Sequence, residues 1–348
     1  MGDKSANRSI LGNDWFQSFS KFRLNHASFL DEIKLTRDAF CLDVLKDLYK
    51  DHIDVQCKNC LLLLLQEHST YLIRDINLLV HVVGSLTNLF CVLGKGSEKR
   101  LLKSPIIMTI TSILLAWTSE DDISKPILNS KAFFLKVIYD TTEDFVVIST
   151  ACKCLEEVEI FYPGILKSEV KDIIAACERH TSPAFQSYSL LICTIIRNMI
   201  CTKNLYNKKI LQDSELNIEE DCGEEIHIFS VVSYLLDLLP VMTYTAAYKV
   251  LKDLICIVKN SSELLPTTFK LFLPRLFMSS EVPLLHLSFD LLQTFGLDLF
   301  SVQEEKFLLK QVGILSTHPC LTSSHKLLYL DWMKDCVAKQ NVFTFSFP

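Results

Sequence analysis

The stretch 142–201 alternates apolar and polar residues at the spacing of α-helices, with two breaks. Its first two helices each carry one apolar stripe, with charged residues opposite. These stripes are Ile148, Ala151, Cys152, Leu155 and Val158, then Leu166, Val170, Ile173, Ile174 and Cys177. Pro163 and Gly164 separate the helices, because proline disfavours helix in the residue before it and glycine tolerates positive φ. The pattern predicts helix, turn, helix.

A third predicted helix, 187–199, differs from the first two because Arg197 is its only charge. Ser182 is suited to the N-cap and Pro183 to the first helical position. A helix that is apolar nearly all round must be covered by neighbours on several sides. Short helical hairpins with alternate helices buried predict an all-α fold, an α-solenoid of the HEAT or armadillo type.

The rest of the chain continues this pattern, with a repeat of about forty residues per helix pair. Further helices are predicted at 14–22, 27–50, 55–67, 71–93, 105–117, 126–139, 226–239, 241–259, 264–278, 282–295, 304–316 and 324–338. We expect a single solenoid domain over 1–348. An acidic, exposed insertion at about 203–225 interrupts it, either as a solvated loop or as a contact for a basic partner. Its acids are Asp213, Glu215, Glu219, Glu220, Asp221, Glu224 and Glu225.

Composition supports the helical interpretation and excludes nucleic acid as the main partner. The 348 residues are 49% hydrophobic and include only 9 glycines, too few for β-rich folds or phosphate-binding loops. A net charge of −6 lacks the basic face that phosphates require. The one small basic cluster is Lys95, Lys99, Arg100 and Lys103. We interpret it as a solvated loop, with weak contact to an acidic membrane surface as the alternative.

Two long uncharged stretches, 76–94 and 104–119, raise the question of a membrane span. The first contains several amide, imidazole and hydroxyl groups, and the second is short for a span. Both are therefore predicted to be buried solenoid helices. The 13 cysteines lie mostly at apolar helical positions and the first residues are polar, which predicts a cytoplasmic location.

A search for catalytic or ligand-binding patterns predicts no catalytic, cofactor-binding or metal-binding residue and no small-molecule substrate. Gly94 and Gly96 lack the third glycine of a dinucleotide-binding loop. Cys57 and Cys60 form half of a zinc pattern without a second half, so we expect them to pack. Cys152-Lys153-Cys154 is weaker still. The nine histidines are scattered, and each is expected to be structural.

Several blocks resemble the family of β subunits of the fifth adaptor protein complex. The central block is 151–159 (ACKCLEEVE), followed by 163–166, Leu190-Leu191 and Arg197-Asn198. A later block comprises 284–286, 295–300 (FGLDLF), 303–305, 308–309, His318-Pro319 and 328–330. Trp15, Phe22-Arg23 and Phe29 match near the start. The resemblance covers nearly the whole chain and the amino-terminal part of the family.

This resemblance implies a non-enzymatic large subunit of a heterotetrameric, clathrin-independent vesicle adaptor. Its implied partners are the ζ, μ and σ subunits, together with spatacsin and spastizin. It implies peripheral association with late endosomes and lysosomes, and a role in protein sorting. Family members continue into an appendage-like region that this chain lacks. The aromatic residues Phe343, Phe345 and Phe347 also differ from the polar cap that normally closes a solenoid, which suggests a short form.

Two other classes share parts of this pattern. A HEAT-repeat scaffold for nuclear transport or a phosphatase-type regulatory subunit would have the same architecture, with a complete set of repeats and a polar cap. A helical enzyme would need three or more convergent titratable side chains.

Overall fold

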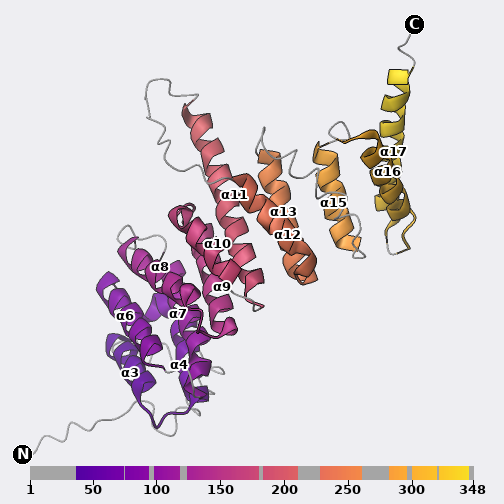
Figure 1. Cartoon of the computed structure of the whole chain (residues 1–348). Helices are drawn as coiled ribbons and strands as arrows, with labels where there is room; N and C mark the ends of the chain where they lie inside the picture. The colour runs from indigo at the N-terminus through magenta and orange to yellow at the C-terminus, as the bar shows by residue number, and fades with distance from the viewer. Residues whose placement is uncertain are drawn as a thin grey trace, which may run out of the picture. The chain divides into compact units, whose positions relative to one another are not determined.

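The computed structural model describes residues 37–73, 75–93, 98–117, 124–179, 183–210, 228–260, 282–295, 300–319 and 321–344. Every regular element in these ranges is a helix (Figure 1). The predicted all-α class is confirmed, and the packing is consistent with a helical solenoid. The repeat type, HEAT or armadillo, stays a prediction.

The chain forms two compact units, the first of which comprises Met1–Tyr162 and Ala175–Ala184. Its helices are α3 (Arg37–Tyr49), α4 (Val55–Glu67), α5 (Ser69–Leu72), α6 (Ile76–Val92), η1 (Glu98–Leu102), α7 (Lys103–Ala116), α8 (Ser124–Tyr139) and α9 (Phe145–Phe161). Consecutive contacts link α4, α7 and α9 into one row and α3, α6 and α8 into a second. Helix α7 contacts members of both rows.

The second unit comprises Pro163–Ile174 and Phe185–Pro348. Its helices are η3 (Lys167–Glu169), α11 (Phe185–Ile210), α12 (Ile228–Leu238), η4 (Leu239–Val241), α13 (Tyr244–Asn260), α15 (Val282–Phe295), α16 (Val302–Ser316) and α17 (Ser323–Thr344). Helix α13 packs between α11 and α15, and α16 packs against α17. The α10 helix (Val170–Arg179) belongs partly to each unit.

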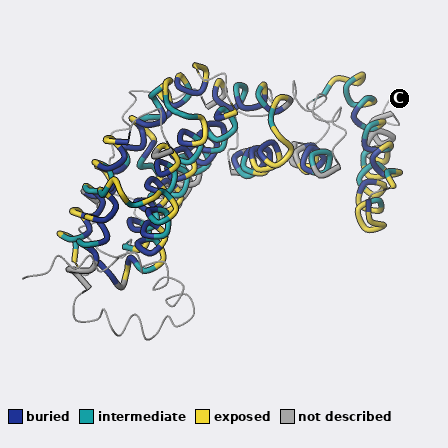
Figure 2. Tube along the Cα trace, turned by 90° about the horizontal axis from the view of Figure 1, so that it is seen from below, coloured by how far each residue is buried: buried dark blue, intermediate teal, exposed yellow. Residues whose placement is uncertain are grey.

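Burial follows the apolar stripes that the sequence predicts. In Figure 2, buried and exposed stretches alternate along the helical turns. Helix α7 is the most enclosed helix of the first unit, because buried residues lie on all but one narrow side of it. In α11, buried side chains run almost continuously from Tyr188 to Ile196, as its lack of charge predicts.

Most predicted helices are present with small boundary shifts. Helices α4 and α15 have the predicted bounds. The predicted helix 71–93 is instead divided into α5 and α6, because Ile73 and Asp75 have extended backbones and the Asp75 side chain accepts a hydrogen bond from the Leu78 amide at 2.9 Å. An aspartate N-cap starts a new helix at this point.

The breaks of the central stretch are partly as predicted. Gly164 has a φ of 91°, which confirms the turn after α9. Pro183 is not the first residue of α11, because it lies in a turn and the helix begins at Phe185. Helix α11 continues to Ile210, so residues 203–210 of the expected insertion are helical. Residues 211–225, Ser182 and the predicted helices 14–22 and 264–278 lie outside the described residues.

A buried ion pair fixes the start of α7 in the first unit. The Lys103 ammonium lies 2.5 Å from a Glu143 carboxylate oxygen, and the two side chains are only 4% and 6% exposed. The ammonium also lies 4.8 Å from the centre of the Phe90 ring. Nearby, Arg100 pairs with Asp144, whose carboxylate caps α9 by accepting the Val146 amide at 2.8 Å. These contacts join η1 and α7 to the start of α9.

A second ion pair joins α11 to α13 in the other unit. A guanidinium nitrogen of Arg197 lies 2.6 Å from an Asp253 oxygen, with the two side chains 28% and 17% exposed. Burial lowers the pKa of Arg197, but the Asp253 charge and hydrogen bond outweigh this effect and the net shift is upward. The single charge of the apolar stretch 187–199 therefore has a partner. Thr243, the residue before α13, donates a hydrogen bond of 2.7 Å to Gln186 of α11.

Replacing Lys103 by Met is expected to lower the free energy of unfolding by about 3–5 kcal/mol, because Glu143 remains charged and buried without its partner. Urea denaturation measures the change. The matched control is Lys46→Met, which removes an exposed pair with Asp43 and is expected to cost under about 1 kcal/mol. If the two variants lose the same free energy of unfolding, burial of the Lys103 pair does not determine its contribution to stability.

Replacing Arg197 by Met is expected to cost about 1–3 kcal/mol, less than the Lys103 variant because water reaches this pair. The double variant with Asp253→Leu should recover most of the loss, since no unpaired charge then remains. Lys252→Met, one residue away on an exposed position of α13, is the control. A double variant as unstable as the single one would contradict this explanation.

Candidate functional site

The cysteines of α9 and α10 do not form a reactive site. Cys152, Cys154 and Cys177 are buried. Burial raises the pKa of Cys154 to about 12 and raises the pKa of Cys152 well above its usual value. A thiol reacts as its thiolate, so Cys152 and Cys154 are unreactive near neutral pH. They act as small apolar core residues, as their helical positions predict.

Cys57 and Cys60 occupy the first turns of α4 and are half-buried. The Cys57 amide donates to the Asp54 carboxylate at 2.8 Å, and its thiol donates to the same carboxylate at 3.0 Å. The hydrogen bond from the Cys57 amide is the main cause of the lowered pKa of Asp54. Asp54 is therefore the N-cap of α4, and Cys57 supports this cap. Within the described residues, no group of three or more His, Cys, Asp and Glu could hold a metal ion.

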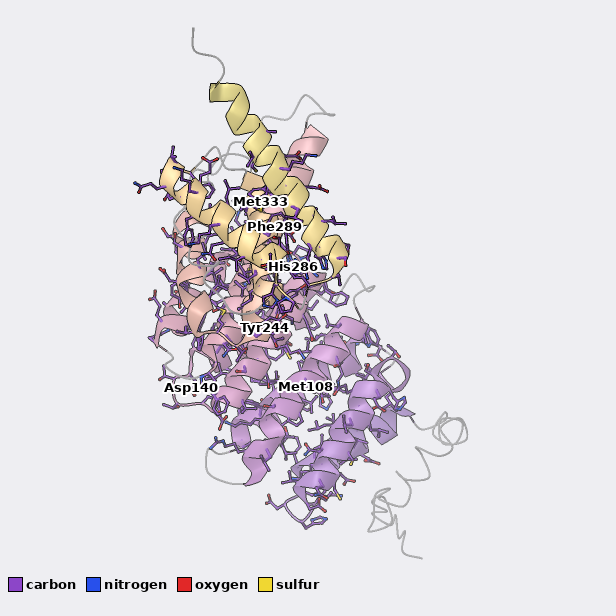
Figure 3. The ribbon with its side chains drawn as sticks, turned by 90° about the vertical axis from the view of Figure 1, so that its right-hand side faces the viewer. Met108, Asp140, Tyr244, His286, Phe289 and Met333 are labelled. Carbon is purple, nitrogen blue, oxygen red and sulfur yellow. The ribbon has the colours of Figure 1, made fainter. Side chains whose placement is uncertain are left out.

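Two of the scattered histidines meet in the second unit. His286 of α15 and His325 of α17 have ring centres 4.4 Å apart. The hydroxyl of Tyr329 is in hydrogen-bonding range of Nδ1 of His286, and Phe289 packs edge-on against Tyr329 at 4.5 Å. Figure 3 shows His286 and Phe289 on α15 and Met333 on α17. Sequence spacing gives no signal for this cluster, because His286 and His325 lie 39 residues apart.

The basic cluster at the start of α7 is not the solvated loop that the sequence suggests. Lys103 is buried in its pair with Glu143, and Arg100 pairs with Asp144. The partners lie about forty residues later in the chain, which is why charge counting alone missed them. Lys95 lies outside the described residues, and only the backbone of Lys99 is described.

Helices α4 and α7 each carry an exposed apolar side chain. The contacts of α7 with α4, α6, α8 and α9 cover its other sides. Met108 of α7 is 44% exposed and Leu63 of α4 is 46% exposed. The two helices are in contact, and the Thr109 hydroxyl of α7 donates to the Leu62 carbonyl of α4 at 3.4 Å. Met108 and Leu63 are the sequence neighbours of these two residues. We call Leu63 and Met108 the free face; Figure 3 labels Met108.

Both residues of the free face are apolar and uncharged. Lys103 is the only charged residue of α7, and it is turned into the core. Exposed methionine and leucine side chains on neighbouring helices suit contact with another apolar surface. The face offers no titratable group for catalysis. No helix among the described residues is long and apolar enough to cross a membrane. Of the two uncharged stretches, residues 104–116 belong to α7 and are mostly buried as predicted, whereas residues 76–92 form α6, which buries one side and exposes the other.

Comparisons with known proteins match two separate parts of the chain. A family model described as "AP-5 complex subunit beta-1, N-terminal" matches residues 42–114. Another, described as "AP5B1, middle domain", matches residues 225–339. The two matches lie in the expected chain order and together cover more than half of the chain. No solved structure matches.

Curated relatives named AP-5 complex subunit beta-1 match almost the full length of the chain. The relative from Xenopus tropicalis is 22% identical over 91% of this chain and 39% of its own. Those from Rattus norvegicus and Homo sapiens are each 24% identical over 91% of this chain and 41% of their own. The chain thus spans about two fifths of the length of the curated relatives it matches. Together with the two family models, these matches place the chain in the AP-5 complex subunit beta-1 family.

Proposed function

We propose that this chain is a non-enzymatic β subunit that helps to assemble an AP-5 adaptor complex. The observation that carries the proposal is the ordered match of the N-terminal and middle family models to one all-α chain. Rows of packed helices provide extended surfaces for partner subunits. The partners are the ζ, μ and σ subunits, with spatacsin and spastizin bound to the assembled complex.

The proposed role follows from that assembly. The complex works in clathrin-independent protein sorting, and the chain is cytoplasmic, held peripherally at late endosomes and lysosomes through its partners. It forms one solenoid trunk. The structure supports a binding role because the described residues offer exposed apolar side chains, while the cysteines of α9 are buried with raised pKa values.

The free face is the part of the first unit that we propose contacts another subunit. Methionine and leucine at the centre of an interface are well suited to burial against an apolar helix. Its neutrality favours a partner surface that is also uncharged, since an unpaired charge buried at an interface is costly. Assembly would cover Leu63 and Met108, which are otherwise left in water.

Co-precipitation tests subunit membership. The tagged chain is expected to recover the ζ, μ and σ subunits from cytosol in fixed stoichiometry. The control for folding is a cooperative thermal transition of the purified chain. A folded chain that recovers none of the three subunits contradicts the proposal; recovery of nuclear transport factors or a phosphatase would instead favour the alternative scaffold class.

A charge placed on the free face tests its role. Met108→Glu is expected to weaken subunit recovery by roughly 30-fold, because losing a central apolar contact costs about 2 kcal/mol or more. Val80→Glu is the matched control, since Val80 is 47% exposed on α6 in the other row. Both variants should keep the unfolding midpoint of the unaltered chain. If Val80→Glu weakens recovery as strongly as Met108→Glu, the free face is not the contact.

A further inference from the structure

The cluster of His286, His325 and Tyr329 connects α15 to α17 through side chains that titrate. Tyr329 is fully buried, Phe289 packs on it edge-on, and Trp332 packs on Phe289 with ring centres 5.3 Å apart. The two imidazoles lie at one end of this cluster, 4.4 Å apart. An aromatic cluster of this kind orders both helices, since each ring contact fixes a side chain of α15 against one of α17.

The Tyr329 hydroxyl lies in hydrogen-bonding range of Nδ1 of His286, while Nε2 is 3.4 Å away. Burial raises the pKa of Tyr329, so its phenol keeps its proton. A neutral phenol can donate to an unprotonated Nδ1 or accept from a protonated one, so the direction of this bond depends on the protonation of His286. Protonation of Nδ1 would require the phenol hydrogen to turn away within a fully buried site.

The charges around His286 also oppose its protonation. Burial is the largest cause of a lowered pKa at His286, and His325 lowers it further, while Asp290 on the same helix opposes the shift. On α13, which packs against α15, the charged residues with described side chains are Lys249, Lys252 and Asp253. On α17, those with described side chains are Lys326, Asp331, Lys334 and Asp335. None of the α13 or α17 charges other than His325 is among the groups that shift this pKa.

We propose that the His286, His325 and Tyr329 cluster is a pH-sensitive contact that holds α17 on α15 at neutral pH and loosens on acidification. When His286 gains a proton, its half-buried ring carries a positive charge beside the His325 ring, and its hydrogen bond with Tyr329 must reverse. Loosening then exposes Trp332 and the buried Tyr329 ring. The contact acts within the second unit and does not depend on subunit assembly.

The direction of the pH effect follows from proton linkage. An open or unfolded state releases His286 to the ordinary histidine pKa of about 6.5, whereas the closed state holds it lower. Below about pH 6.5 the open state therefore binds more protons than the closed one, and the stability of the contact falls as pH falls. For one proton, the opening constant rises by up to roughly tenfold per pH unit between the two pKa values.

Hydrogen exchange measured by mass spectrometry tests the proposal on the full chain. Backbone amides of α15 and α17 are compared at pH 7.5 and pH 5.5, after correction for the intrinsic exchange rate. We expect their opening constant to rise several-fold at pH 5.5, while α7 amides keep theirs. His286→Gln keeps an acceptor for Tyr329 but cannot titrate, so its opening constant should be independent of pH. The matched control, His81→Gln on the exposed side of α6, should respond like the unaltered chain.

A second variant keeps the test decisive if His286→Gln fails to fold. His325→Gln removes the facing imidazole from an exposed position and leaves His286 titrating closer to its ordinary value, so the acid response should shrink. Titration of the His286 ring by NMR gives its pKa directly, and a value at or above 6.5 overturns the proposal. An acid response of equal size in both variants and in the unaltered chain overturns it as well.

Discussion

Helices that are apolar on more than one side are the constraint on which this structure depends. Such a helix cannot remain in water, so it must be covered by neighbours from several directions. Helix α7 illustrates the requirement, because α4 and α9 flank it and α6 and α8 lie behind it. In the second unit α11 and α13 meet the same requirement. The row of helices in each unit is the outcome.

Within these rows, buried charges specify which helices meet. Lys103 finds Glu143 at the end of the α8–α9 connection, and Arg197 finds Asp253 on α13. An apolar helix surface packs against many others, whereas a buried ammonium or guanidinium needs a carboxylate at one place. We interpret the pairs as devices for register rather than as major sources of stability. The pair with Glu143 also explains why Lys103 is buried although it belongs to a basic cluster with the composition of a surface loop.

Exposed apolar side chains are the surface feature on which the proposed binding role rests. The thiols of Cys152 and Cys154 are buried in the core, while Leu63 and Met108 of the free face are exposed. The chain belongs to the AP-5 complex subunit beta-1 family. The histidine cluster adds a different property, since it places a titratable group in the contact between two helices without making it a site for substrate.

The sequence by itself determined the helical class, most helix positions and the family. Apolar spacing and the turn at Pro163 and Gly164 are local properties, and each is readable within a few residues. The capping box of Ser301 and Glu304 has the same local character, because it is readable as Ser-X-X-Glu. Local reading was wrong where a single side chain competes with the helix, as Asp75 does by capping α6.

Only the tertiary structure decided which distant residues meet. His286 and His325, Lys103 and Glu143, and Arg197 and Asp253 are each separated by about forty residues or more, and no periodicity connects them. The free face likewise became visible only when the neighbours of α7 were placed, because Met108 has the same apolar character as the buried residues around it. Helical spacing shows which side of a helix is apolar, but the partner that covers that side depends on the packing of the whole unit.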